Sequence, residues 1–312
     1  MLSRVAENIY WMARCIERAE NTARLVSVNA NLLLDLPRGV QLDWEPLITI
    51  VGMNQPFRER YSEASERNVM RFLIGDQNNP NSILSSLRNA RENCRTVRDI
   101  VPRSGWERLN ELFLYAKDNV NSGLTKGGRY AYLTRIITGS QGISGLLSGT
   151  MARDEAYQFL RIGRNLERAD MTTRIIDVRS TDLLPEETPE SKAFDTIQWI
   201  SVLNSLSAYQ AYRRLVQVQV SRAAVLIFLF QNRLFPRAFN HCIDTVKDGL
   251  QPLKNSQQGV KVLADLKELV EATPVNTLRQ TPLHDFIDRL QLEVINLHKV
   301  LEKSYFLPRL ET

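Results

Sequence analysis

The sequence is poor in the residues that build disulfide frameworks and metal sites. Its 312 residues include only three histidines and three cysteines, Cys15, Cys94 and Cys242. The cysteines lie far apart and form no CxxC pair, which excludes a disulfide framework and gives no zinc-binding spacing. The histidines show no ligand spacing either. We therefore expect no metal, no cofactor and a reducing environment.

Long apolar runs are also absent. The longest, residues 223–230, is far shorter than the ~20 residues that a membrane-spanning helix requires. Glu7 falls where a signal peptide would need an apolar core, which argues against secretion. These features predict a cytoplasmic protein that does not enter a membrane.

Neither sign of charge dominates. The 40 Lys and Arg residues face 35 Asp and Glu residues, which gives a net charge of +5 and an isoelectric point of about 9.1. This balance permits an acidic partner but lacks the large basic excess typical of nucleic-acid-binding proteins. A helical scaffold for nucleic acid is therefore the least favoured of the functional hypotheses.

Alternating β-strand patterns are scarce, whereas apolar residues recur at helical spacing along almost the whole chain. The 12 prolines fall between these periodic segments. Proline is tolerated in the first turn of a helix and breaks its interior, so this distribution separates many helices. The sequence predicts an all-α protein with about a dozen helices.

One charged phrase occurs twice, as "RCIERAENTAR" in residues 14–24 and "RNLERADMTTR" in residues 164–174. Extended to residues 14–28 and 164–178, the two stretches are identical at seven of fifteen positions. Further matches follow in the same order, including Trp44 with Trp199 and Pro80 with Pro236. The chain therefore reads as a tandem duplication of one helical unit.

The duplication predicts two copies, residues 1–150 and 151–312. Duplicated units commonly pack as a pseudo-symmetric pair, as in a two-fold dimer. We expect a pseudo-two-fold helical bundle, with both copies in one compact body. The acidic stretch of residues 180–190 is predicted to be a loop within the second copy, and residues 283–306 a long amphipathic helix.

The charged phrases lie on predicted buried helices. In residues 5–30 an apolar stripe runs through Val5, Ile9, Met12, Ile16, Ala19, Ala23 and Val26. At 100° per residue, Glu20 lies in or beside this stripe, with Arg24 one turn further on. The second phrase places Asp170 and Arg174 in the same way, beside a stripe of Phe159, Ile162, Leu166, Ala169 and Ile176.

Such phrases can have a purely structural meaning. An exposed acid–base pair four residues apart stabilises a helix by only ~0.2–0.5 kcal/mol, and most charged helix faces are simply solvated. A carboxylate inside an apolar stripe, however, is costly unless it is paired and hydrogen-bonded. Two interpretations stay open, a structural carboxylate–guanidinium network and a network that also contacts a ligand. Arginine competes for the carboxylates, which disfavours a metal.

Two further stretches are candidates for ligand contact. Residues 139–150, "GSQGISGLLSGT", are rich in glycine and serine and could cradle a phosphate, but they lack the ending of a P-loop. A hinge or a helix with a small-residue face is the favoured alternative. Residues 207–215 bring Tyr209, Tyr212 and Arg213 together, either for ligand stacking or as core.

No nucleophile elbow, dinucleotide fingerprint or cysteine with a base partner is present. The chain therefore lacks the marks of a self-sufficient enzyme.

The repeated phrases carry a family resemblance. The segments "MLSRVAENIYWMARCIERAENTARLVSVN" and "GTMARDEAYQFLRIGRNLERADMTTRIIDV" resemble the alpha-E domain family, and the likeness covers essentially the full length. Cys15 and Gln210 depart from residues common in that family. The family motif falls on Trp11 and on the candidate charged centre, which comprises Glu7, Arg14, Glu17, Arg18, Glu20, Arg24, Arg153, Asp154, Arg164, Glu167, Arg168, Asp170 and Arg174.

The resemblance implies an all-helical bacterial protein associated with a circularly permuted ATP-grasp ligase. On this basis the leading hypothesis is a non-catalytic or co-catalytic accessory protein that binds an ATP-grasp ligase or its peptide substrate through the Glu/Arg clusters. The alternative is an enzyme of peptide modification in which paired carboxylates act as general acid and base.

Overall fold

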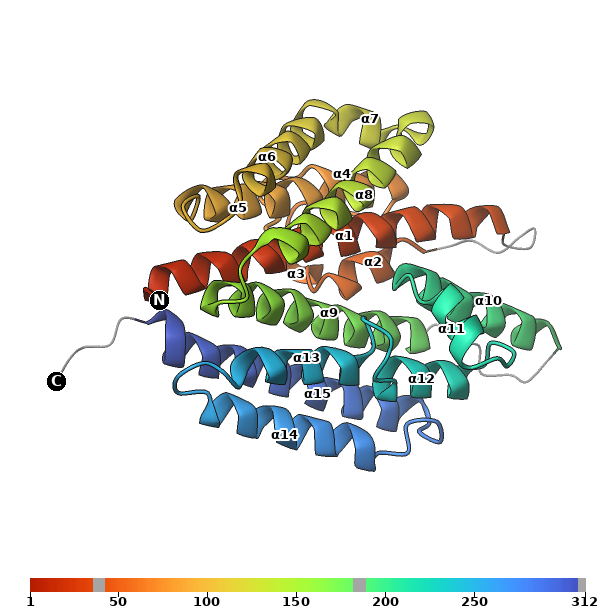
Figure 1. The fold of residues 1–312 in the computed structure, drawn as a ribbon. Coiled ribbons are helices and arrows are strands. Elements are labelled where there is room, and N and C mark those ends of the chain that lie inside the picture. Colours follow the sequence, from red (N-terminus) through yellow and green to blue (C-terminus); the bar gives the residue numbers. More distant parts are fainter. Residues whose placement is uncertain (36–42, 182–188, 308–312) are drawn as a thin grey trace. The chain divides into compact units, whose positions relative to one another are not determined.

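The computed structural model describes residues 1–35, 43–181 and 189–307, and all regular structure in these ranges is helical (Figure 1). The predicted all-α class is confirmed, with fifteen α-helices and one π-helical turn in the described ranges. The chain divides into two compact units, Met1–Arg164 and Asn165–Thr312. This division falls inside a helix, α9, fourteen residues beyond the predicted copy boundary (164 against 150).

The described helices follow closely on one another in both units. Those that lie in the first unit are α1 (Ser3–Asp35), α2 (Glu45–Ile50), α3 (Asn54–Arg58), α4 (Glu66–Ile74), α5 (Ile83–Thr96), α6 (Arg103–Asp118), α7 (Val120–Leu124) and α8 (Lys126–Thr150). The remainder are α9 (Glu155–Thr181), α10 (Pro189–Ser205), α11 (Tyr209–Leu215), α12 (Arg222–Gln231), α13 (Phe239–Leu250), α14 (Gln257–Ala272), α15 (Gln280–Leu301) and the π-helical turn η1 (Glu302–Phe306).

Helix α1 is the core element of the first unit, where it packs against α5, α8 and α4 (Figure 1). Its predicted apolar stripe is buried, except that Val5 is only half-buried. Residues off the stripe, such as Tyr10, Ala13 and Leu25, are buried as well. A helix surrounded in this way must bury the polar residues of its sequence along with the apolar ones.

The glycine- and serine-rich residues 139–150 form the second half of α8. The phosphate-loop interpretation of this stretch is therefore wrong, because its amides are engaged in a helix. Some of its small residues allow close packing against a neighbouring helix, and others face open space. A Cβ atom on Gly139 would lie 2.6 Å from Leu112 of α6, whereas one on Gly142 would meet nothing within 4 Å.

In the second unit α14 lies beside both α13 and α15 (Figure 1). The predicted amphipathic helix at residues 283–306 is seen as α15 and η1. Of the aromatic residues in 207–215, Tyr212 is fully buried, and its hydroxyl donates to the carbonyl oxygen of Gln219 at 3.0 Å. Tyr212 is thus a core residue, while Arg213 is exposed beside the half-buried Tyr209 ring.

Two helices of the second unit begin at positions that the sequence matches to helix starts of the first. Ser65 and Ser221, which are as far apart in the sequence as the matched Pro80 and Pro236, are the N-cap residues of α4 and α12. The next helices, α5 and α13, again begin at corresponding positions, Ile83 and Phe239. The tandem duplication and its two-fold packing stay predictions. Of the predicted acidic loop, residues 182–188 lie outside the described residues.

The described prolines lie in first helical turns or between helices, as expected from the sequence. No described helix combines the length with the apolar character needed to cross a bilayer.

Within the first unit, the start of α9 approaches α1 closely at Gly163. A Cβ atom there would lie 2.4 Å from the carbonyl oxygen of Tyr10. Since backbone cannot yield as a flexible side chain can, we predict that Gly163→Ala lowers the free energy of unfolding by ~1–3 kcal/mol. Chemical denaturation followed by circular dichroism measures the change.

Gly142→Ala is the matched control, because it adds the same methyl group to an exposed helical position with open space around it. It should stabilise the protein by up to ~1 kcal/mol through helix propensity. Equal effects of the two substitutions would show that the close approach at Gly163 is not sterically demanding.

Candidate functional site

The first charged cluster is built around Glu20, which is 1% exposed in the middle of α1. One of its carboxylate oxygens accepts a hydrogen bond from Arg24 at 2.5 Å and another from the side-chain amide of Gln141 at 3.1 Å. Gln141 projects from α8, in the stretch first considered as a phosphate loop. The contact from Gln141 thus joins α1 to α8, and together with Arg24 it satisfies a carboxylate that is buried away from water.

Glu17 and Arg18 extend this cluster along α1. Glu17 is 1% exposed and interacts with a partner. Arg18 is half-buried and donates to the side-chain oxygen of Asn81 at 3.0 Å. Asn81 in turn donates to the carbonyl oxygen of Val51 at 3.1 Å. The charged phrase therefore also fixes the segment that precedes α5.

Arg14 lies one turn before Glu17 and is 8% exposed. It donates to the Tyr10 hydroxyl at 3.0 Å, and its guanidinium lies 5.2 Å from the centre of the Trp11 ring. Such a stacked guanidinium keeps its charge while its planar faces contact aromatic surface.

The second cluster lies in the second unit, on α9. Asp170 accepts a hydrogen bond from Arg174 at 2.9 Å, which repeats the Glu20–Arg24 pairing one turn apart. Glu167, like Glu17, is buried at 2% exposure and has a partner. Arg168 is half-buried. The two clusters thus share their pattern of a buried glutamate followed by an acid–arginine pair.

The other residues of the candidate charged centre take no part in the Glu20–Arg24 and Asp170–Arg174 pairs. Arg153 and Arg164 both bind Ser148, the first at its carbonyl oxygen and the second at its hydroxyl. Asp154 accepts from the backbone N–H of Tyr157 at 3.1 Å and so caps the start of α9. Glu7 is half-buried near the start of α1. Arg153, Arg164 and Asp154 stabilise the connection between α8 and α9.

Two cavities of the first unit lie apart from Glu17 and Glu20. One, of about 280 Å³, is lined by residues of α1 and α8 together with Glu66, which pairs with Arg129 at 2.7 Å. The other, of about 650 Å³, contains Asp76, which accepts hydrogen bonds from Arg60 at 2.8 and 2.9 Å. Neither cavity is lined by a carboxylate of the repeated phrases.

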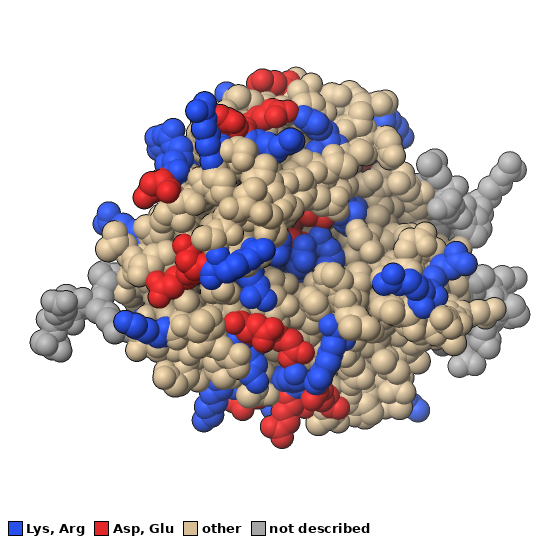
Figure 2. Space-filling model, viewed as in Figure 1, with Lys and Arg blue, Asp and Glu red and all other residues tan. Residues whose placement is uncertain are grey.

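Surface charge on the face seen in Figure 2 is mixed, with basic and acidic residues interspersed. Nucleic-acid-binding faces are typically contiguous and basic. The face drawn there does not favour the nucleic-acid hypothesis.

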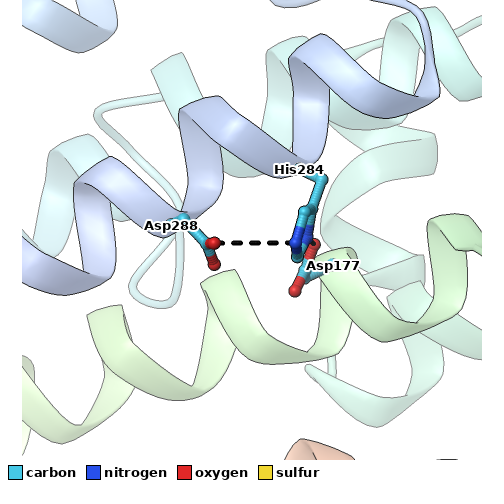
Figure 3. Close-up of side chains that lie close together, drawn as sticks. All are labelled: Asp177, His284 and Asp288. Atoms are coloured by element: carbon cyan, nitrogen blue, oxygen red, sulfur yellow. Dashed lines mark hydrogen bonds and ion pairs between the residues drawn. The ribbon is translucent and has the colours of Figure 1, made fainter.

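The structure also brings together three residues that sequence reasoning missed. His284 and Asp288 of α15 lie beside Asp177 of α9, and their potential ligand atoms are all within 4.8 Å of one another (Figure 3). Burial raises the pKa of the Asp177 carboxyl, although its hydrogen bond with His284 acts in the opposite direction. That hydrogen bond raises the pKa of His284. The available sequence signal was the four-residue spacing of His284 and Asp288.

Comparison with known proteins gives one match. The model of the Alpha-E family, described as a predicted alpha-helical domain with a conserved ER motif, matches residues 1–306. No curated protein and no solved structure matches the chain. The chain contains Glu-Arg dipeptides at several places, but the two in the repeated phrases, at Glu17 and Glu167, are those with a buried glutamate.

The burial of Glu20 leads to a stability prediction. Glu20→Gln removes the charge that Arg24 faces at 2.5 Å, in a pair whose side chains are 2% and 13% exposed. We expect the free energy of unfolding to fall by ~1–3 kcal/mol, because a largely buried guanidinium then faces a neutral amide instead of a carboxylate. Urea denaturation of the two proteins at pH 7 measures this difference.

Glu111→Gln provides the control, since it removes the acid of an exposed pair with Arg135. Such a surface pair contributes ~0–1 kcal/mol. A loss at Glu20 no larger than at Glu111 would contradict a structural role for the buried pair.

Proposed function

Because the chain belongs to the Alpha-E family, we propose that it acts as an accessory subunit of an ATP-grasp-type amide ligase system. In this role it binds the ligase or the ligase's peptide substrate through its two Glu/Arg clusters. The link to an ATP-grasp ligase rests on the family resemblance of the sequence. The clusters supply the physical means of binding.

The supporting observation is that each cluster anchors arginines that still reach solvent. The Arg24 side chain is 13% exposed and is held by Glu20, while Arg174 is 28% exposed and is held by Asp170. Arginines held in place lose little conformational entropy on binding, and they recognise carboxylates and backbone carbonyls through several donors at once. Arginine is also enriched among the interface residues that dominate binding affinity.

The alternative function, general acid–base catalysis by paired carboxylates, has less support. A catalytic carboxyl must come within hydrogen-bond reach of the substrate atom. Glu20 is engaged by Arg24 and Gln141, and neither of the two first-unit cavities described above contains Glu17 or Glu20. Engaged and buried acids of this kind fit a role in holding the arginines in place.

A binding measurement tests the proposal. We predict that the purified ATP-grasp ligase of the same organism binds the native chain, and that Arg24→Gln/Arg174→Gln weakens binding at least about tenfold. The reason is that a hydrogen bond to a charged group contributes ~1.5–3 kcal/mol, and 1.4 kcal/mol corresponds to tenfold in Kd. Isothermal titration calorimetry, with and without the peptide substrate, measures both values.

The control is Arg135→Gln/Arg233→Gln, which removes one arginine of an exposed ion pair from each unit. Circular dichroism establishes that both double variants are folded. Equal binding by the two variants would rule out the clusters as the binding surface. Absence of binding by the native chain, together with no change in ligase turnover of ATP, would contradict the accessory role itself.

A further inference from the structure

A second polar site lies in the second unit, where the side chains of Asp177, His284 and Asp288 meet at the surface (Figure 3). His284 Nδ1 lies 2.7 Å from a carboxylate oxygen of Asp177, and His284 Nε2 lies 3.5 Å from one of Asp288. The side chains of His284 and Asp288 are 48% and 55% exposed, whereas Asp177 is 15% exposed. Solvent therefore has access to the side occupied by Asp288.

The contact with Asp177 orients the imidazole ring. A neutral histidine that donates its Nδ1 proton to Asp177 carries its lone pair on Nε2, the nitrogen that faces Asp288. A carboxylate that accepts from the far nitrogen of a histidine is the usual outer partner of a metal ligand. It fixes the tautomer and makes the ligating nitrogen more basic.

The spacing along α15 also suits a metal ion. Residues four apart lie on one face of a helix, and metal-binding helices use this spacing for two ligands. A nitrogen and an oxygen that each lie about 2.0–2.2 Å from a tetrahedral zinc ion are themselves about 3.3–3.6 Å apart. The separation of 3.5 Å between His284 Nε2 and Asp288 falls within this range.

We propose that His284 and Asp288 bind a divalent transition-metal ion of the zinc class, with Asp177 as a positioning residue. One imidazole nitrogen and one carboxylate oxygen favour zinc-like ions over magnesium or calcium, which prefer oxygen ligands. Exposure of the pair leaves the other coordination positions open to water or to a group of a bound molecule. This proposal departs from the absence of metal expected from the sequence, and it is independent of the accessory role.

Titration of the metal-free full-length protein, without a histidine tag, tests the site. We predict one saturable site for Zn²⁺ by calorimetry at pH 7.5, and a Co²⁺ absorption spectrum that Zn²⁺ abolishes. His284→Gln and Asp288→Asn should each eliminate saturation. Asp177→Asn should weaken binding about 10–100-fold, the usual effect of removing an outer-shell partner.

His241→Gln is the matched control, because His241 lies on α13 of the same unit and contacts the carbonyl oxygen of Arg233 instead of a carboxylate. The three cysteines are buried and so do not compete for the ion. The proposal is overturned if the native chain shows no saturable binding, or if binding survives His284→Gln and Asp288→Asn. Unchanged affinity in Asp177→Asn would remove the positioning role alone.

Discussion

The fold of the first unit depends on the burial of carboxylates inside its central helix. Glu17 and Glu20 are each 1% exposed in α1. Charged groups of this kind stay ionised in a protein interior only where donors surround them. The donors to Glu20 come from its own helix, through Arg24, and from α8, through Gln141. Rotation of either helix would separate the buried Glu20 carboxylate from Gln141, so this contact specifies how α1 and α8 face each other.

Helix α1 also constrains how far the neighbouring segments lie from it. At Gly163 the backbone of α9 approaches Tyr10 so closely that a Cβ atom would force the backbone to shift. Nearby, Arg18 binds Asn81, whose amide holds the carbonyl of Val51. Polar contacts and close backbone approach therefore act together, because each hydrogen bond reaches its partner only when the helices lie at one separation. Apolar burial alone would tolerate small shifts among such positions.

Much of this arrangement could be predicted from local sequence, and the reasons for the exceptions are physical. Apolar spacing predicts the burial of the stripes on α1 and α9, except at Val5, and it places Glu20 in or beside the first stripe. It does not predict the burial of residues off the stripe, such as Tyr10 and Leu25. At residues 139–150 composition left a phosphate loop open beside the favoured hinge or helix with a small-residue face, and the structure has the helix, in which Gly139 and Ser140 pack closely. The partners Gln141 and Asn81 carry no pattern of their own. Their roles arise from tertiary contacts, and so does the meeting of Asp177 with His284.

The two polar sites differ in what the fold requires of them. A buried acid such as Glu20 needs its arginine for stability whether or not a ligand exists, so its pairing alone is weak support for function. The observation that supports a binding function is that the side chains of Arg24 and Arg174 stay partly exposed while they pair with their acids. His284 and Asp288 present the opposite case, since exposed side chains gain little from being paired. Asp177, which is mostly buried, orients only the His284 ring. The exposed approach of His284 Nε2 to Asp288 is the part of the arrangement that metal coordination would use.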